Sequence, residues 1–226
     1  MGRPEPNLPE VPPPMSSGVG VRHLDLFSGI GGFAVAAQRV GWQTIGFCEI
    51  DPFCLDVLER RFDCDGWFSL PGPFDGEKDG RWGVERFTEL PRIAPDWIVI
   101  ENVYKPWRRW MPELRRRLYD IGYSSLPLRV RASDVGAVHQ RARGWVVANA
   151  DCEQLRLLSG WFCWEGRQKA LQLAQTWDSE PRGLGKDDGV PAWTHRHKSL
   201  GNAIVPQAAE LIFTGINSVL GGLPDK

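Results

Sequence analysis

Apolar and polar positions follow two different periods along the first third of the chain, and the pattern predicts two strand–helix pairs. A short apolar run over residues 21–27 predicts a strand, and the apolar spacing over residues 33–40 predicts a helix. The run over residues 44–50 predicts a second strand, and a proline near the first turn favours a second helix over residues 51–61. This order is typical of the opening of a doubly wound parallel sheet.

The remaining pattern continues the same fold class. A continuous apolar run over residues 95–103 predicts a strand buried on both faces. Residues 64–81 are rich in Gly, Pro and Asp, which predicts a loop. The other expected elements are a helix over 82–90, a basic helix over 112–121, strands over 124–130 and 143–148, and a last helix over 207–220.

The domain organisation follows from where periodicity is lost. Residues 1–18 are rich in proline and lack periodicity, so we expect a disordered tail. Periodicity fails again from residue 151 to about residue 191, where Trp, Gly, Arg and Asp are mixed. We therefore expect an α/β main domain over 19–150, a small irregular insertion over 151–197, and a segment over 198–226 that returns to the main domain.

Composition excludes some classes of protein. The formal net charge is −1, so any basic surface for nucleic acid must be local. No apolar run approaches the roughly 20 residues that span a bilayer. The five cysteines form no CxxC pair and no zinc-type spacing, so we expect no metal site and a reduced, cytoplasmic setting.

The sequence DLFSGIGGF places a glycine-rich turn directly after the first strand. It matches neither the dinucleotide fingerprint nor the triphosphate loop, since no Lys-Ser follows Gly32. Glu49 ends the next strand, where an acid can accept hydrogen bonds from ribose hydroxyls. These features favour a nucleoside ligand such as S-adenosylmethionine, and a plain tight turn beside a surface acid stays open as the alternative.

Four segments in order resemble the DNA cytosine-5 methyltransferase family. They are DLFSGIGGF followed by EID, ENV at 101–103, DVGAVHQRARGWVVA at 134–148, and LGNAIVP at 200–206. The third resembles the family's Q-x-R-x-R segment, with His139 in the Gln position. The resemblance covers most of residues 21–220 and implies a Rossmann-like, S-adenosylmethionine-dependent methyltransferase fold.

The resemblance also implies roles for individual residues. Glu101 would stabilise the base adduct near a ring nitrogen, and Arg141 and Arg143 would orient a phosphate or the base carbonyl. A solvated acid at a strand end and a salt-bridged sheet edge remain the alternatives. The residues expected to line the cofactor are Phe27, Gly29, Gly31, Gly32, Glu49, Ile50, Asn202 and Ala203.

One part of the family pattern is missing. The family carries its nucleophile in a Pro-Cys-Gln loop before ENV, and this chain contains no Pro-Cys dipeptide. We expect that one strand unit and the loop are deleted, which would leave a gap in the sheet. Cys64 is the only cysteine in this interval, but Asp63 and Asp65 flank it and would raise the pKa of its thiol.

Two segments are candidates for contact with DNA. Residues 107–117, WRRWMPELRRR, combine two Trp with five Arg, which suits phosphate binding or, equally, a solvated helix face with Trp in the core. The resemblance implies that residues 151–197 read the target sequence and that the substrate is double-stranded DNA with a flipped cytosine.

Two functions are therefore expected as alternatives. The first is methyl transfer from S-adenosylmethionine to carbon-5 of cytosine in DNA, by a monomer with a restriction endonuclease as partner in a restriction–modification system. The second is an internally deleted, catalytically dead relative that only binds cofactor or DNA.

Overall fold

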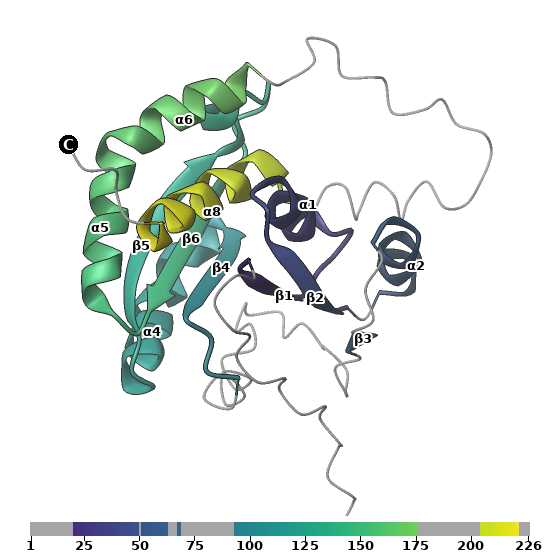
Figure 1. The fold of residues 1–226 in the computed structure, drawn as a ribbon, viewed down its shortest axis with the longest axis horizontal. Coiled ribbons are helices and arrows are strands. Elements are labelled where there is room, and N and C mark those ends of the chain that lie inside the picture. The colour runs from purple at the N-terminus through teal and green to yellow at the C-terminus, as the bar shows by residue number, and fades with distance from the viewer. Residues whose placement is uncertain (1–19, 50, 63–66, 69–92, 176–203, 222–226) are drawn as a thin grey trace, which may run out of the picture.

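The structure, a computed structural model, describes residues 20–49, 51–62, 67–68, 93–175 and 204–221 (Figure 1). Within these residues, no helix has both the length and the apolar character to cross a membrane.

The first half of the chain forms a three-stranded parallel sheet with two helices. Its elements are β1 (Arg22–Leu26), α1 (Gly32–Arg39), β2 (Gln43–Cys48), α2 (Pro52–Arg61) and β3 (Trp67–Phe68). The strand order is β1-β2-β3, and both pairs are parallel. The strand–helix alternation predicted from residues 21–61 is confirmed, with boundaries shifted by one or two residues.

The second half forms a separate sheet. It contains β4 (Trp97–Val103), β5 (Ser124–Arg131) and β6 (Ala142–Asn149) in the order β4-β6-β5. Here β6 runs antiparallel to both neighbours, so β4 and β5 are parallel to each other. Among the described residues no strand pairing joins the two sheets.

Helix α4 (Tyr104–Asp120) begins eight residues earlier than the predicted start at residue 112. It follows β4 directly, and Pro112 lies inside the helix rather than at its start. Pro106 falls in the first turn, where the missing N–H costs nothing because first-turn donors have no partner within the helix. Trp107 anchors this early turn: it is buried, and its indole packs so closely on Gly144 of β6 that a Cβ there would overlap the ring.

The expectation of an irregular segment after residue 151 is wrong for residues 152–174. They form α5 (Cys152–Cys163) and α6 (Glu165–Ala174). Asp151 caps α5 by accepting a hydrogen bond from the Glu153 N–H. The buried side chains of α5 recur every third residue, at Leu155, Leu158 and Trp161, and pack into the main core.

Helix α8 (Pro206–Leu220) crosses in front of β5 and β6 in Figure 1 and lies between α1 and the helices α5 and α6. The last helix was predicted over residues 207–220, and this is confirmed. Its buried face belongs to one apolar cluster that also contains side chains of α1, β6, α5 and the short helix η2 (Ala132–Val135). In this cluster Phe33 of α1 meets Trp145 of β6 edge to face, with ring centroids 5.7 Å apart.

Polar contacts fix α8 against the first sheet. The indole of Trp42 stacks on Phe213 at 4.3 Å and donates a 2.6 Å hydrogen bond to the Asn217 side-chain oxygen. The Asn217 amide in turn donates to the carbonyl of Val40, at the end of α1. Asn217 therefore satisfies one donor and one acceptor that lie at the junction of α1 and β2.

Glu210 links both halves to α8. One carboxylate oxygen lies 3.4 Å from Arg39 of α1, and the other lies 3.6 Å from Lys169 of α6. The Glu210 side chain is only 12% exposed, so solvent screens these pairs less than surface pairs. Packing and side-chain contacts of α8 thus connect two sheets that strand pairing does not connect.

Replacing Asn217 tests this connection. Asn217→Ala leaves the Trp42 N–H and the Val40 carbonyl without their partner, and each such loss costs about 1–3 kcal/mol when the group cannot reach water. We expect a lower free energy of unfolding by about 2 kcal/mol in denaturant titration. The matched control is Ser218→Ala, which removes only a hydroxyl bonded within the helix to Thr214 and should change stability by less than about 0.5 kcal/mol. Equal effects of the two changes would contradict the role given to Asn217.

Candidate functional site

The turn between β1 and α1 has an unusual backbone. Phe27, Gly29 and Gly31 all have positive φ, at 61°, 54° and 86°. Glycine adopts this region freely, but Phe27 pays a steric cost for it. Phe27 is nevertheless 47% exposed. A strained, exposed aromatic residue at the end of a parallel strand is typical of a ligand site.

Ser28, in the turn between β1 and α1, hydrogen-bonds to both β1 and β2. The sequence alone did not identify it as a site residue. It is buried, its hydroxyl donates to the Asp25 carbonyl at 2.8 Å, and its N–H donates to the Cys48 carbonyl at 3.1 Å. The Cys48 N–H donates back to the hydroxyl at 3.2 Å. A serine inside a turn commonly makes such local bonds, and this is the signal that could have found it.

Glu49 lies against the glycine turn, as the sequence spacing suggested. One carboxylate oxygen accepts the Gly29 N–H at 2.6 Å, and the other accepts the Asp51 N–H at 2.8 Å. Asp51 in turn caps α2 through the N–H groups of Phe53 and Cys54. The Glu49 carboxylate thus joins the glycine turn to the start of α2.

The last sequence motif reaches the same turn. A Cβ at Gly32 would lie 3.1 Å from the Ile204 side chain and 3.2 Å from the Ile204 carbonyl. Glycine is therefore needed where the chain before α8 passes over the start of α1. Of the residues expected to line the cofactor, the structure brings together Phe27, Gly29, Gly31, Gly32 and Glu49, whereas Ile50, Asn202 and Ala203 lie outside the described residues.

The three residues expected to serve a base also lie together. In the β4–β6 register Glu101 faces Trp145 and Val103 faces Arg143, so Glu101 and Arg143 are diagonal neighbours on one face. The Arg143 guanidinium lies 2.7 Å from the Glu101 carboxylate. Arg141, two residues earlier, is close enough for its charge to act on both.

The electrostatics of this group are set by burial. Burial raises the pKa of Glu101 to about 7, although the charges of Arg143 and Arg141 pull it down. Burial also lowers the pKa of Arg141, helped by the neighbouring Arg143 charge. A carboxyl group with a pKa near neutral can donate a proton or a hydrogen bond to a ring nitrogen and can accept it back.

Other predicted residues are not part of either cluster. His139 is exposed, and no ion pair of it is seen in the described part of the chain. Cys64 lies outside the described residues, so its distance from Glu101 is not defined. Cys48 and Cys54 are buried, as expected for Cys54, whereas Cys152 and Cys163 are exposed on α5.

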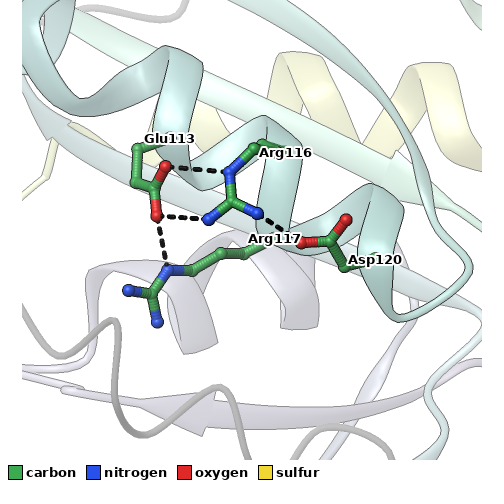
Figure 2. Close-up of polar contacts among 4 residues, drawn as sticks. All are labelled: Glu113, Arg116, Arg117 and Asp120. Atoms are coloured by element: carbon green, nitrogen blue, oxygen red, sulfur yellow. Dashed lines mark hydrogen bonds and ion pairs between the residues drawn. The ribbon is translucent and has the colours of Figure 1, made fainter.

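Two arginines of the basic stretch of α4 pair with acids of the same helix. Figure 2 shows Arg116 and Arg117 both bonded to Glu113, with Arg116 also bonded to Asp120. Arg115 donates instead to Ser125 of β5. Because Trp107 is buried, the described side chains match the alternative of a solvated helix face with Trp in the core.

Comparisons with known proteins give a consistent result. The C-5 cytosine-specific DNA methylase family matches residues 21–70. Type II methyltransferase M.AplI of Arthrospira platensis is 28% identical over 155 residues, which is 55% of this chain and 44% of that protein. Type II methyltransferase M2.BsuMI of Bacillus subtilis is 29% identical over 160 residues, which is 56% of this chain and 41% of that protein. The chain thus spans less than half the length of either relative.

Solved structures of methyltransferases resemble the fold more distantly. The S. pombe Dnmt2 methyltransferase shares 19% identity, with a TM-score of 0.42 over 57% of this chain and 49% of that one. The Entamoeba histolytica methyltransferase EhMeth shares 20% identity, with a TM-score of 0.44 over 59% of this chain and 54% of that one.

The raised pKa of Glu101 predicts a pH-dependent stability. The unfolded state releases this proton near pH 4.5 and the folded state near pH 7, so ionisation of Glu101 lowers the free energy of unfolding as pH rises across that range. The slope is at most about 1.4 kcal/mol per pH unit. Glu101→Gln should remove this contribution, measured as the difference between wild-type and variant urea titrations at pH 5 and pH 8. A difference that does not change with pH would contradict the assignment.

Neutralising Glu113 tests whether the basic face of α4 meets DNA. Glu113→Gln releases Arg117 and leaves Arg116 paired only with Asp120, so binding of mixed-sequence DNA should tighten and its salt dependence should steepen by about one phosphate contact. The control is Asp56→Asn, which frees Arg60 on α2 and changes net charge equally. Equal shifts in the two variants, measured by fluorescence anisotropy, would indicate a general charge effect and exclude α4 as the contact.

Proposed function

We propose, from the chain's similarity to the DNA cytosine-5 methyltransferase family, that it binds S-adenosylmethionine at the glycine turn and a cytosine of DNA at Glu101. The reaction is transfer of the methyl group to carbon-5 of the base. The observation that carries this proposal is the partly buried group of Glu101, Arg143 and Arg141 at the end of β4.

The donor side is supported by the fit of the glycine turn. S-adenosylmethionine supplies the methyl group and presents ribose hydroxyls, and Glu49 places a carboxylate, the group type that accepts hydrogen bonds from hydroxyls, against the glycine turn. Phe27 offers an exposed ring beside the turn, and the absence of a Cβ at Gly29 lets a ligand approach the backbone. Ile50, Asn202 and Ala203 complete the proposed site by their positions in the matching motifs.

The base side is supported by the charge state of Glu101. With a pKa of about 7, its carboxyl can bear the proton that a cytosine ring nitrogen needs as the base accepts electron density. Arg143 holds the carboxylate in place, and Arg141 lies beside the pair to bind the base carbonyl or a phosphate. The base must leave the helix stack to reach this position.

A nucleophile that adds to carbon-6 is required for the family chemistry, and Cys64 is the candidate. A thiolate there would form the covalent bond that makes carbon-5 nucleophilic. Asp63 and Asp65 flank Cys64 and oppose ionisation of its thiol. This part of the proposal therefore requires other groups that favour the thiolate.

The absence of a Pro-Cys dipeptide favours a second candidate function. In this alternative the chain binds the donor and DNA but does not turn over, because loss of a nucleophile costs many orders of magnitude in rate. In either case we propose a cytoplasmic monomer, with residues 151–197 reading the target and a restriction endonuclease as its partner.

Methyl transfer decides between the two functions. Purified chain is incubated with tritiated S-adenosylmethionine and mixed-sequence DNA, and label in DNA is counted. The first function predicts incorporation that Cys64→Ser and Glu101→Gln abolish. The matched control is Glu59→Gln, which changes an exposed acid on α2 and should keep full activity.

Binding without incorporation would support the second function. Calorimetry with S-adenosylmethionine then gives heat of binding that Glu49→Ala removes, while label in DNA stays at background. Absence of both binding and incorporation would contradict both functions.

A further inference from the structure

Asp25 is the one charged side chain that is buried among the described residues. It is the fourth residue of β1, is 2% exposed, and pairs in register with Phe47 of β2. Its Oδ2 has no hydrogen-bond partner among the described residues. Burying a carboxyl oxygen without a hydrogen bond costs free energy. A buried carboxyl of this kind therefore calls for an explanation.

The carboxyl of Asp25 takes the place of a side-chain cap at the start of helix α1. Helix α1 begins after Gly31, which has no side chain and makes no capping bond. The carboxyl of Asp25 accepts the N–H of Ala34, the third residue of the helix. This is the donor that a capping Ser or Asp would normally satisfy, so the strand before the turn caps the helix after it.

We propose that Asp25 is a positioning residue whose carboxyl fastens the first turn of α1 to β1 and thereby fixes the glycine turn. Phe27, Gly29 and Gly31 lie between these two attachment points, and all have positive φ. With both ends of the turn held, the Gly29 N–H stays directed at Glu49. The consequence for donor binding rests on the proposed function; the attachment itself does not.

The charges around Asp25 favour its neutral form. Burial raises the pKa of Asp25 to about 8, the Ala34 hydrogen bond opposes this, and the negative charge of Glu49 adds to it. His23, two residues earlier on the same strand, supplies no compensating charge, because burial lowers its pKa to about 4. Helix α1 carries one charged side chain, Arg39 at its far end, where it pairs with Glu210.

The neutral form of Asp25 keeps a second negative charge away from Glu49. Ionisation of Asp25 would place a buried negative charge near Glu49, with no cationic partner among the described residues. The folded state would respond by loosening the turn, since an unpaired buried charge is far more costly than a moved loop. The affinity of the glycine turn for S-adenosylmethionine should therefore fall as pH rises through 8.

Asp25→Asn is the deciding variant. Its amide keeps the acceptor for Ala34 and cannot ionise. Binding of S-adenosylhomocysteine, the stable demethylated product, is measured by calorimetry from pH 6.5 to pH 9. The dissociation constant of the wild type should rise about tenfold more than that of Asp25→Asn, because about one tenth of the sites stay protonated one unit above the pKa. The ligand's own amino group titrates equally with both proteins, so parallel profiles would overturn the proposal.

Two measurements on ligand-free protein test the role of Asp25 independently of S-adenosylmethionine binding. Carbon-13 NMR of labelled aspartate carboxyls, assigned by comparison with Asp25→Asn, should give an apparent pKa for Asp25 near 8, and a value below 5 would overturn the proposal. Amide exchange at Ala34 should be about tenfold faster in Asp25→Ala than in Asp25→Asn, as expected for loss of a cap worth about 1.4 kcal/mol. Equal exchange would overturn it, whereas an absence of ligand binding with both results as expected would contradict only the proposed function.

Discussion

The packing of α8 is the constraint on which the rest of the structure depends. Two three-stranded sheets carry the two halves of the candidate site, and strand pairing does not join them in the described residues. Their connection is the apolar cluster around α8, strengthened by Asn217 on the α1 side and by Glu210, which contacts both sides. The relative position of Glu49, on one sheet, and Glu101, on the other, therefore depends on the packing of α8.

Burial of carboxyl groups is the second theme of the site. Asp25 and Glu101 both have raised pKa values, Asp25 with a hydrogen bond from a backbone N–H and Glu101 with a guanidinium beside it. At the turn, a neutral Asp25 adds no second charge beside Glu49. At the end of β4, a carboxyl that titrates near neutral pH is suited to proton exchange with a base. Burial of a carboxyl thus helps to fix the glycine turn through Asp25 and suits Glu101 to proton exchange.

The sequence predicted the first sheet well because local signals agreed there. Periodicity, the glycine turn and the proline at residue 52 all mark the same boundaries. Helix α5 was missed because its spacing is carried by Leu155, Leu158 and Trp161 amid polar and small residues, and only burial shows which positions matter. The i, i+3 and i, i+4 pairs of Glu113 were readable from the sequence and explain why the basic stretch is not a free cationic surface. The task of Asp25 could not be read, because it depends on a helix that starts seven residues later.

The direct test of the account is native-state hydrogen exchange across the two sheets. The amides of Phe47 in β2 and Val147 in β6 lie on different sheets and are both deeply buried. If α8 makes them one cooperative unit, both amides open with the same free energy and the same dependence on denaturant. Opening of Phe47 at a clearly lower free energy, with Val147 still protected, would show that the two sheets unfold separately and would contradict the central role of α8.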